Sequence, residues 1–289
     1  MRKYVPWLES DVLSEQSQET YVDELGVSIQ EHILNDALQP MFHRFNQRMA
    51  IVHIFTSNKL EGTLARGTSE GETYELLGHL WDTEKEYEDE TIWLADGERR
   101  FMKTQMSHHV RALKHLLRLE SIQSEDLVTI HGMLMKNAKG EKTLIRAGKF
   151  REGAVHADHH VYPDHTCIRP SLHKILEIFR QQSTATLPFH QAVELSIRLF
   201  YDLITLHPFD DGNGRMCRMV LAFALIKTGV APFPLSLSSG HSKSRKHYIS
   251  AILSVRGKQD WFPMRALVLV SLHRAWQNLS TNAKFESMA

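Results

Sequence analysis

The sequence predicts a mainly α-helical protein with one short β-hairpin. Apolar residues recur at three- and four-residue steps over residues 41–59 and again between Leu195 and Leu206, which is the spacing of the buried stripe on a helix. Residues 146–163 break this pattern with two glycines, a short alternation of apolar and polar residues, and a terminal Pro163. This combination favours a hairpin inserted between helices.

The elements are expected in the following order. The polar, weakly periodic residues 1–40 should form short helices that pack on the rest of the chain. An amphipathic helix at about 41–62 ends at Gly62, a residue type that commonly terminates helices. The stretch 66–100 contains an acidic run at 84–90, which we interpret as a solvated helix face. Further helical segments are expected at 102–119, 124–138, 170–182, 189–206, 214–228, 243–255 and 261–279.

The composition excludes several classes of protein. Apolar residues make up 42% and charged residues 24%, and basic and acidic residues number 34 each, so no global charge favours nucleic acid or membrane. Neither a signal peptide nor an apolar run of roughly 18 residues is present. Cys167 and Cys217 cannot form a disulfide framework and lack metal-ligand spacing. We therefore expect a soluble cytoplasmic protein that binds neither nucleic acid nor membrane.

The most informative segment is 207–218, with the sequence HPFDDGNGRMCR, between two apolar helical runs. Pro208 ends the first helix, and Gly212 and Gly214 relax the backbone of the turn that enters the second. Such a turn aims several backbone N–H groups at one point, where the helix dipole favours an anion. We therefore expect a phosphate-binding site here.

Four side chains of this segment supply the chemistry of phosphoryl-type transfer. Arg215 and Arg218 share one helix face and can extend the anion site. Asp211 offers a hard oxygen ligand for Mg²⁺ held between protein and nucleotide. His207, at the end of the preceding helix, can take a proton from an incoming nucleophile. The whole set favours catalysis over a His–Pro turn with incidental charges.

The segment matches the motif HxFx[DE]GNGRxxR of the Fic family at every fixed position, and the chain resembles the protein adenylyltransferases of that family over most of its length. The resemblance implies a Fic-type helical bundle with a small β-hairpin flap. It implies an N-terminal extension at 1–100 that carries the helix at about 41–62. A Fic core would follow at 101–280, with the flap at 146–163 and the catalytic loop at 207–218.

The resemblance also implies roles for the motif residues. His207 would be the base for a target hydroxyl, and Asp211 would be the ligand of Mg²⁺ bound with ATP. The residues implied in phosphate and ATP binding are Gly212, Asn213, Gly214, Arg215 and Arg218. Among them, Asn213 and the two glycine backbones would form an anion hole, and Arg218 would hold the γ-phosphate.

A second segment, SNKLEG at 57–62, resembles the family's inhibitory signature [ST]xxxE[GN]. Ser57 and Glu61 are four residues apart and therefore share one helix face. In the family this glutamate pairs with the second motif arginine, here Arg218, and leaves ATP in an unproductive pose. Its place before the catalytic motif resembles the subclass with an N-terminal inhibitory helix. A surface carboxylate at a helix end is the alternative interpretation of Glu61.

The flap resemblance is looser. The sequence GKFR at 148–151 resembles the lead-in to the family's flap, which clamps a target by β-augmentation. It implies target contacts by Gly148, Phe150 and Arg151. Four histidines follow at irregular spacing, so a polar flap surface is favoured over a metal site. These histidines are His156, His159, His160 and His165.

The segment KSRKHYISAI at 243–252 resembles the family's Y-x-x-A-[LI] element. The resemblance implies that Tyr248 lies near the adenine, and an ordinary half-buried helix tyrosine is the alternative. The basic residues of this segment, Lys243, Arg245 and Lys246, lack interleaved aromatic residues, so we interpret them as helix-face charge.

Taken together, the sequence predicts a protein adenylyltransferase that moves AMP from Mg-ATP to a hydroxyl of a target protein, or of itself, and is autoinhibited by Glu61. Three alternatives stay open. One is removal of AMP from a modified protein by water that Glu61 activates. Another is transfer of a different group, such as phosphocholine. The third is a non-catalytic nucleotide-sensing or target-binding module in which His207 is vestigial. Formation of a homodimer is also left open.

Overall fold

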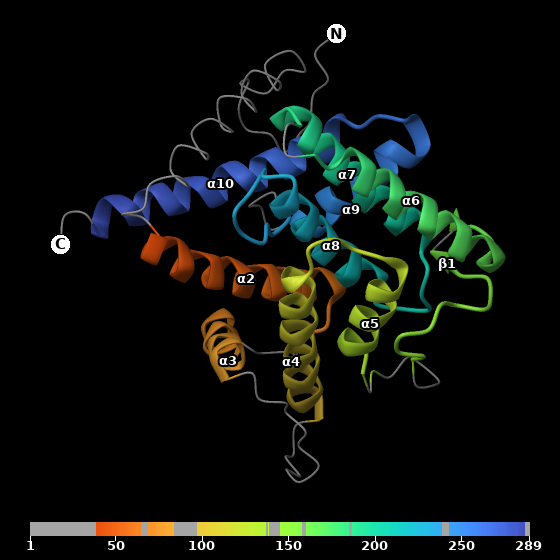
Figure 1. The fold of residues 1–289 in the computed structure, drawn as a ribbon. Helices are drawn as coiled ribbons and strands as arrows, with labels where there is room; N and C mark the ends of the chain where they lie inside the picture. The colour runs from red at the N-terminus through yellow and green to blue at the C-terminus, as the bar shows by residue number, and fades with distance from the viewer. Residues whose placement is uncertain are drawn as a thin grey trace.

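The computed structural model describes residues 39–64, 69–83, 97–136, 138, 145–157, 160–184, 187–238 and 243–286. Its elements in chain order are α2 (Gln39–Glu61), α3 (Glu70–Thr83), α4 (Gly97–Arg118), α5 (Ser124–Leu134), β1 (His156–Ala157), β2 (His160–Val161), the 3₁₀ turn η2 (His165–Cys167), α6 (Ile168–Gln182), α7 (Phe189–Leu206), α8 (Asn213–Lys227), α9 (Ser244–Lys258) and α10 (Phe262–Glu286). The predicted fold class, a helical bundle with a small hairpin, is confirmed (Figure 1).

Helix α8 forms the centre of the bundle. It packs against α7, α2, α4 and α5, which surround it in Figure 1. All its side chains from Met216 to Leu225 are buried, as expected for a helix that is apolar on every side. Burial of each large apolar side chain contributes roughly 1.5–3 kcal/mol. The residues at the N-terminus of α8 are therefore attached to a helix that is buried between four others.

The predicted apolar stripe of α7 is buried as expected. Leu195, Leu199, Leu203 and Leu206 retain at most 8% of their accessible surface. The helix ends at Leu206, two residues before Pro208, in agreement with the predicted helix stop. At the other side of the bundle α2 ends at Glu61, and Gly62 takes the left-handed conformation with φ 71°.

Helix α3 was not predicted as a separate element, because its polar composition hides the apolar stripe. Its buried side chains are Thr73, Leu77 and Leu80. Helix α5 ends at Leu134 rather than at residue 138. The next residue, Met135, leaves the helical conformation and places its sulfur 3.2 Å from Arg215 Nη2.

Two of the predictions lie outside the described residues. One is the acidic run at 84–90. The other is the set of short helices at 1–40, of which only the backbone of residues 39 and 40 is described, as the start of α2.

The predicted hairpin is present with strands of two residues each, in which His156 faces Val161 and Ala157 faces His160 across an antiparallel pair. Within the described residues, no helix combines the length and apolarity that crossing a bilayer requires.

Candidate active site

The catalytic loop begins at a strained residue. His207, the C-cap of α7, has φ 51° and ψ 61°, a left-handed conformation that costs a residue with a side chain roughly 1–2 kcal/mol. Arg151, from the lead-in to the flap, stabilises this turn. Its Nε donates to the carbonyl oxygen of His207 at 2.7 Å and its Nη2 to that of Leu206 at 3.3 Å. Carbonyls that the end of α7 leaves without helical partners are thereby satisfied.

The same guanidinium also fixes both ends of the flap. It donates to the carbonyl oxygens of Gly153 and Pro163. In addition, the backbone N–H of Arg151 donates to the carbonyl oxygen of Pro208 at 3.0 Å. Only 1% of Arg151 is exposed. Its charge faces backbone carbonyls that are buried or partly buried, and it positions the flap relative to His207. A target contact by this side chain stays a prediction.

Phe209 anchors the loop in the core. It is fully buried and stacks on the ring of His131, with centroids 3.7 Å apart. The Nδ1 of His131 accepts the backbone N–H of Gly148 at 3.0 Å, so the neutral ring carries its proton on Nε2 and donates it to the carbonyl of Asp211 at 2.9 Å. Burial lowers the pKa of His131 to about 4. His131 was not predicted as a site residue; the signal that could have indicated it is a histidine on the buried face of α5.

The other two predicted flap residues also pack inward. Gly148 has φ 69°, and a Cβ there would lie 3.1 Å from the carbonyl oxygen of Val128, so the position requires glycine. The ring of Phe150 lies 5.4 Å from that of Phe209. Both residues hold the base of the flap against the loop. Their predicted contact with a target stays a prediction, and in the hairpin itself Val161 is 60% exposed.

The first turn of α8 presents the predicted anion site. Gly212, its N-cap, has φ 76°, and the initial N–H groups of any helix lack helical acceptors. The side chain of Asn213 is engaged with the loop backbone, so the predicted anion-hole role of this residue would fall to its backbone N–H. Its Oδ1 accepts the N–H of Phe209 at 3.0 Å and its Nδ2 donates to the carbonyl of Phe209 at 2.8 Å. Asn213 braces the loop, and only its backbone N–H is left for an anion.

Arg215 is buried with an unused donor. Its Nη1 donates to Gln105 Oε1 at 2.9 Å and its Nη2 contacts the sulfur of Met135. Its Nε is buried and has no acceptor in the part of the chain that the structure describes. Because buried donors are nearly always paired, this geometry fits an additional acceptor such as a phosphate oxygen.

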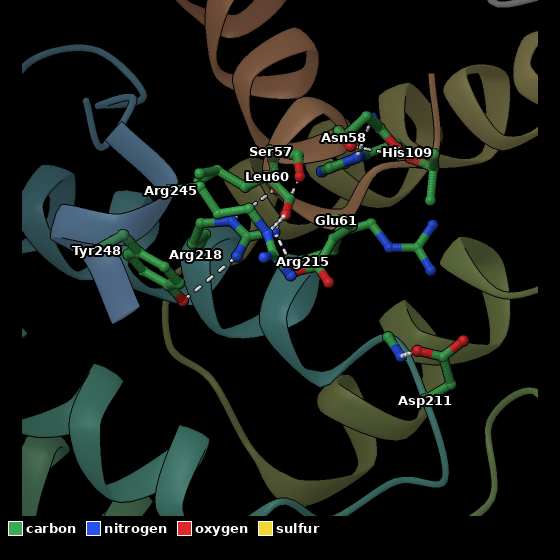
Figure 2. Close-up of polar contacts among 12 residues, drawn as sticks. Ser57, Asn58, Leu60, Glu61, His109, Asp211, Arg215, Arg218, Arg245 and Tyr248 are labelled. Atoms are coloured by element: carbon green, nitrogen blue, oxygen red, sulfur yellow. Dashed lines mark hydrogen bonds and ion pairs between the residues drawn. The ribbon is translucent and has the colours of Figure 1, made fainter. Parts of the chain in front are cut away.

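Arg218 makes polar contacts with residues of both α2 and α9 (Figure 2). Its Nε donates to Ser57 Oγ at 2.9 Å, its Nη2 to the Ser57 carbonyl at 3.0 Å and to Glu61 Oε1 at 2.7 Å. Its Nη1 lies 3.3 Å from the hydroxyl of Tyr248. The structure thus brings together both residues of the predicted inhibitory signature and the second motif arginine.

The ion pair between Glu61 and Arg218 is buried on one side only. The side chain of Arg218 is 3% exposed and that of Glu61 is 34% exposed. Burial raises the pKa of Glu61, but the charge of Arg218 and its hydrogen bond outweigh this effect, so the pKa lies below its usual value. The carboxylate also lies where a side chain on Gly214 would be, since an added Cβ would overlap Glu61 Oε1. Glycine is needed at this position for space rather than for backbone freedom.

Helix α9 closes the site beside Arg218. Tyr248 is 5% exposed, and burial raises its pKa to about 12, so the hydroxyl stays protonated. Arg245, which the sequence analysis interpreted as helix-face charge, donates from Nε to the carbonyl of Leu60 at 2.8 Å. It therefore caps the last turn of α2, immediately before Glu61 (Figure 2).

The predicted base is neutral at physiological pH. Burial lowers the pKa of His207 to about 4. Its Nδ1 lies 3.4 Å from the carbonyl oxygen of Ile204, which can only accept, so Nδ1 carries the proton of the neutral ring. Nε2 then keeps a lone pair, as a proton acceptor requires.

The donor set suits a metal shared with a substrate rather than a protein cage. Among the described residues, no three His, Cys, Asp or Glu side chains gather to hold an ion; His159 lies outside them. Asp211 is exposed, and its Oδ1 accepts the N–H of Gly212 at 2.6 Å. One carboxylate beside an anion site fits Mg²⁺, which binds through one or two carboxylates and substrate phosphates. Cys217 is buried, and burial raises the pKa of its thiol, so it is not an activated nucleophile.

The sequence model of the Fic/DOC family matches residues 121–225, which include α5, the flap, the catalytic loop and most of α8. The chain contains a Fic domain. The matched range is shorter than the predicted core at 101–280, and those wider bounds remain a prediction.

Curated relatives match this chain over less than half of its length. A protein adenylyltransferase Fic from Nematostella vectensis is 28% identical over 123 residues, 42% of this chain and 27% of that protein. Protein adenylyltransferase fic-1 from Caenorhabditis elegans is 25% identical over 120 residues, 42% of this chain and 22% of the relative. The chain therefore matches about a quarter of the length of these two proteins. A Fido domain-containing protein from Dictyostelium discoideum is 25% identical over 139 residues, 48% of this chain and 95% of that protein.

Solved structures resemble the Fic domain and its flanking helices over most of the chain. A fragment of Fic-1 from C. elegans superposes with a TM-score of 0.66 at 18% identity, covering 94% of this chain and 73% of the fragment. A Fic domain containing signaling protein from Bacteroides thetaiotaomicron gives a TM-score of 0.66 at 17% identity, with 92% of this chain and 97% of that chain covered. At these identities the likeness concerns the fold.

Proposed function

We propose that this protein transfers AMP from ATP to a hydroxyl group of a protein, and that Glu61 restrains the activity. The observation that carries the proposal is the set of contacts around Arg218. A buried guanidinium beside the N-terminus of a central helix is paired with a partly exposed carboxylate, and the neighbouring Arg215 keeps an unused buried donor. This is a site for phosphates with an acidic side chain in it. The relatives named protein adenylyltransferases support the choice of reaction.

In the proposed step, the oxygen of a target hydroxyl forms a bond to the α-phosphorus of ATP. The bond from that phosphorus to the bridging oxygen breaks, and pyrophosphate leaves. The hydroxyl proton passes to Nε2 of His207, whose lone pair is free. The first N–H groups of α8, with Arg215 and Arg218, stabilise charge on the phosphates. When bound, Mg²⁺ would neutralise further phosphate charge, and Asp211 would hold it.

Restraint by Glu61 follows from competition for one guanidinium. Glu61 Oε1 lies 2.7 Å from Arg218 Nη2 and against Gly214, so a γ-phosphate cannot reach that edge of Arg218 until the carboxylate moves. Breaking the pair without a replacement would leave a buried charge with fewer partners, which is unfavourable. A phosphate supplies the replacement. We therefore propose that Glu61 and the nucleotide alternate on Arg218.

A second activity, removal of AMP from a modified protein, is favoured by the position of the same carboxylate. Glu61 is ionised, partly exposed and lies over Gly214 at the start of the anion site. It could orient and deprotonate a water that attacks a phosphodiester bound there. The wild-type chain would then release AMP from labelled protein, and the Glu61→Gln variant would not.

The proposal is tested by labelling with ATP that carries the label on either its α- or γ-phosphate. We expect Glu61→Gly to label itself from α-labelled ATP at least tenfold faster than wild type, and Glu61→Gly/His207→Ala to remain unlabelled. Glu177→Gly, on α6 remote from the site, controls for glycine in a helix. Label from the γ-position would indicate phosphate transfer. That result, or no label in Glu61→Gly when ATP is bound, would overturn the proposal.

A further inference from the structure

We infer that Tyr162 is the positioning residue of the base: its ring holds the His207 imidazole in place and connects it to the flap. The two rings are stacked, with centroids 3.8 Å apart and an angle of 21° between their planes. Tyr162 is the residue directly after β2 and is 9% exposed. This inference rests on the proposed function, because it assigns a partner to the base of that reaction.

Tyr162 is itself held from several sides. Its backbone N–H donates to the carbonyl oxygen of Val155 at 3.2 Å, which continues the hairpin by one pair. The ring of His160 meets it edge-on at 4.8 Å. The guanidinium carbon of Arg256, on α9, lies 5.6 Å from its centroid, within the range of a cation–π contact. The ring therefore has a defined position from which to orient His207.

The imidazole of His207 needs such a support, because its hydrogen bonding is weak. The contact from Nδ1 to the carbonyl of Ile204, at 3.4 Å, is at the long limit for a hydrogen bond. In the region that the structure describes, no carboxylate accepts a hydrogen bond from the His207 ring. The histidine of a Ser-His-Asp triad, by contrast, is oriented by such a bond to an aspartate. A planar stack at van der Waals distance supplies the orientation instead.

The stack also determines how readily His207 accepts a proton. Burial dominates its environment, and the charged groups around it are Arg151 from the flap, Arg256 from α9 and Asp211 from the loop. The first two disfavour the imidazolium and the third favours it. Removal of the Tyr162 ring would admit water to one face of the imidazole, and the pKa of His207 would rise toward its ordinary value of 6.5. Phenylalanine at position 162 would still cover this face of the imidazole, so the pKa of His207 would change little.

The experiment compares Tyr162→Ala and Tyr162→Phe in full-length protein. The His207 signal is followed by NMR titration and assigned by its loss in His207→Ala. We expect the alanine variant to raise the His207 pKa by one unit or more and the phenylalanine variant to leave it within a few tenths of wild type. In the Glu61→Gly background, self-labelling should fall about tenfold or more with alanine, and the acid limb of its pH profile should move up with the pKa. Phenylalanine should retain at least half of the rate.

An unchanged His207 pKa in Tyr162→Ala would overturn the inference, as would a phenylalanine variant as impaired as the alanine one. If the alanine variant does not fold, Tyr162→Val, whose side chain is much smaller than the ring and so still opens one face of the imidazole to water, serves in its place. The titration needs no catalysis. Should every variant stay unlabelled while the pKa moves as expected, the proposed function fails and the positioning of His207 by Tyr162 stands.

Discussion

The catalytic loop and the last turn of α2 both border the first turn of α8, but different kinds of contact hold them. The loop is fixed by buried and partly buried carbonyls that accept from Arg151, and by the stacked rings of Phe209 and His131. The end of α2 is held partly by buried hydrogen bonds from Arg218 to Ser57 and partly by contacts nearer solvent. The contacts nearer solvent are the pair of Glu61 with Arg218 and the hydrogen bond from Arg245 to Leu60.

This difference indicates which side can move. Breaking a contact on the loop side leaves unsatisfied carbonyls or an empty space in the core, which costs several kcal/mol. On the α2 side, water can solvate a freed Glu61, and a phosphate can replace it on Arg218. We infer that the loop is preorganised for phosphates while the glutamate is exchangeable. The predictions below test this asymmetry in order of decreasing effect.

Arg151→Ala should have the largest effect. It removes the donors to the carbonyls of Leu206, His207, Gly153 and Pro163, and we expect a loss of about 4 kcal/mol in unfolding free energy. Chemical denaturation measures this directly. Lys149→Ala, an exposed lysine two residues earlier, is the control and should stay within about 0.5 kcal/mol of wild type. Equal stability of the two variants would show that the loop does not depend on Arg151.

His131→Ala should cost about 2 kcal/mol at pH 7, because it leaves Gly148 N–H and the Asp211 carbonyl unpaired. It should also change the pH dependence. The pKa of buried His131 is about 4 against an ordinary 6.5, so the unfolded chain binds more protons between these values and wild-type stability falls as pH decreases from 6.5 toward 4.

His131→Ala removes one of the groups responsible for this pH dependence. The unfolding free energy of the variant should therefore fall less steeply between pH 6.5 and 4. Denaturation curves at pH 4.5, 5.5, 6.5 and 7.5 give the slope. His79→Ala, at an exposed position on α3, is the matched control and should keep the wild-type slope. A slope unchanged in His131→Ala would mean that this histidine is not buried as a neutral ring.

Glu61→Gln should have a smaller effect on stability, about 1 kcal/mol or less at pH 7, since the carboxylate is 34% exposed and solvent weakens the pair. The pKa of Glu61 is lowered in the folded state. Its contribution is therefore complete above the unfolded pKa of about 4.5 and is lost as pH falls through the folded value. The unfolding free energies of wild type and variant should therefore converge as pH falls through the folded pKa of Glu61. A difference in unfolding free energy that persists at such low pH would mean that Glu61 stabilises the protein by packing rather than by its charge.

Arg245→Ala should have the smallest effect. It removes one partly buried hydrogen bond to the last turn of α2, worth about 0.5 kcal/mol, at the low end for a hydrogen bond. We expect self-labelling from α-labelled ATP to rise about twofold above wild type, below the rate of Glu61→Gly. Lys246→Ala, an exposed neighbour on α9, should leave the rate unchanged. A rate that falls in Arg245→Ala would mean that Arg245 acts on the nucleotide rather than on α2.

Much of this arrangement was predictable because its signals are local in sequence. Periodicity located the helices from α4 to α10, and the position of residues 207–218 between two apolar runs correctly predicted a turn that leads into α8. The SNKLEG segment placed Ser57 and Glu61 on one face, and their contacts with Arg218 are present. The roles of these residues in catalysis and inhibition remain proposals.

What sequence reasoning missed depends on contacts between distant residues. Arg151 satisfies carbonyls 55 and 56 residues away, and Arg245 reaches Leu60 across 185 positions. No local pattern distinguishes a buried arginine from an exposed one. Gly214 illustrates the same limit: the turn was expected to need its flexibility, whereas the structure needs the space that a Cβ would fill beside Glu61.

The central claim, that Glu61 and the terminal phosphate of ATP compete for Arg218, is tested most directly by nucleotide affinity. Calorimetry with Mg²⁺ would measure ATP and ADP binding to His207→Ala and to Glu61→Gly/His207→Ala, in which transfer is blocked. The account predicts ATP and ADP affinities within about threefold of each other when Glu61 is present, and a preference for ATP at least tenfold larger when it is absent, because Arg218 then gains a charged partner. The same ATP/ADP ratio in both proteins would contradict it.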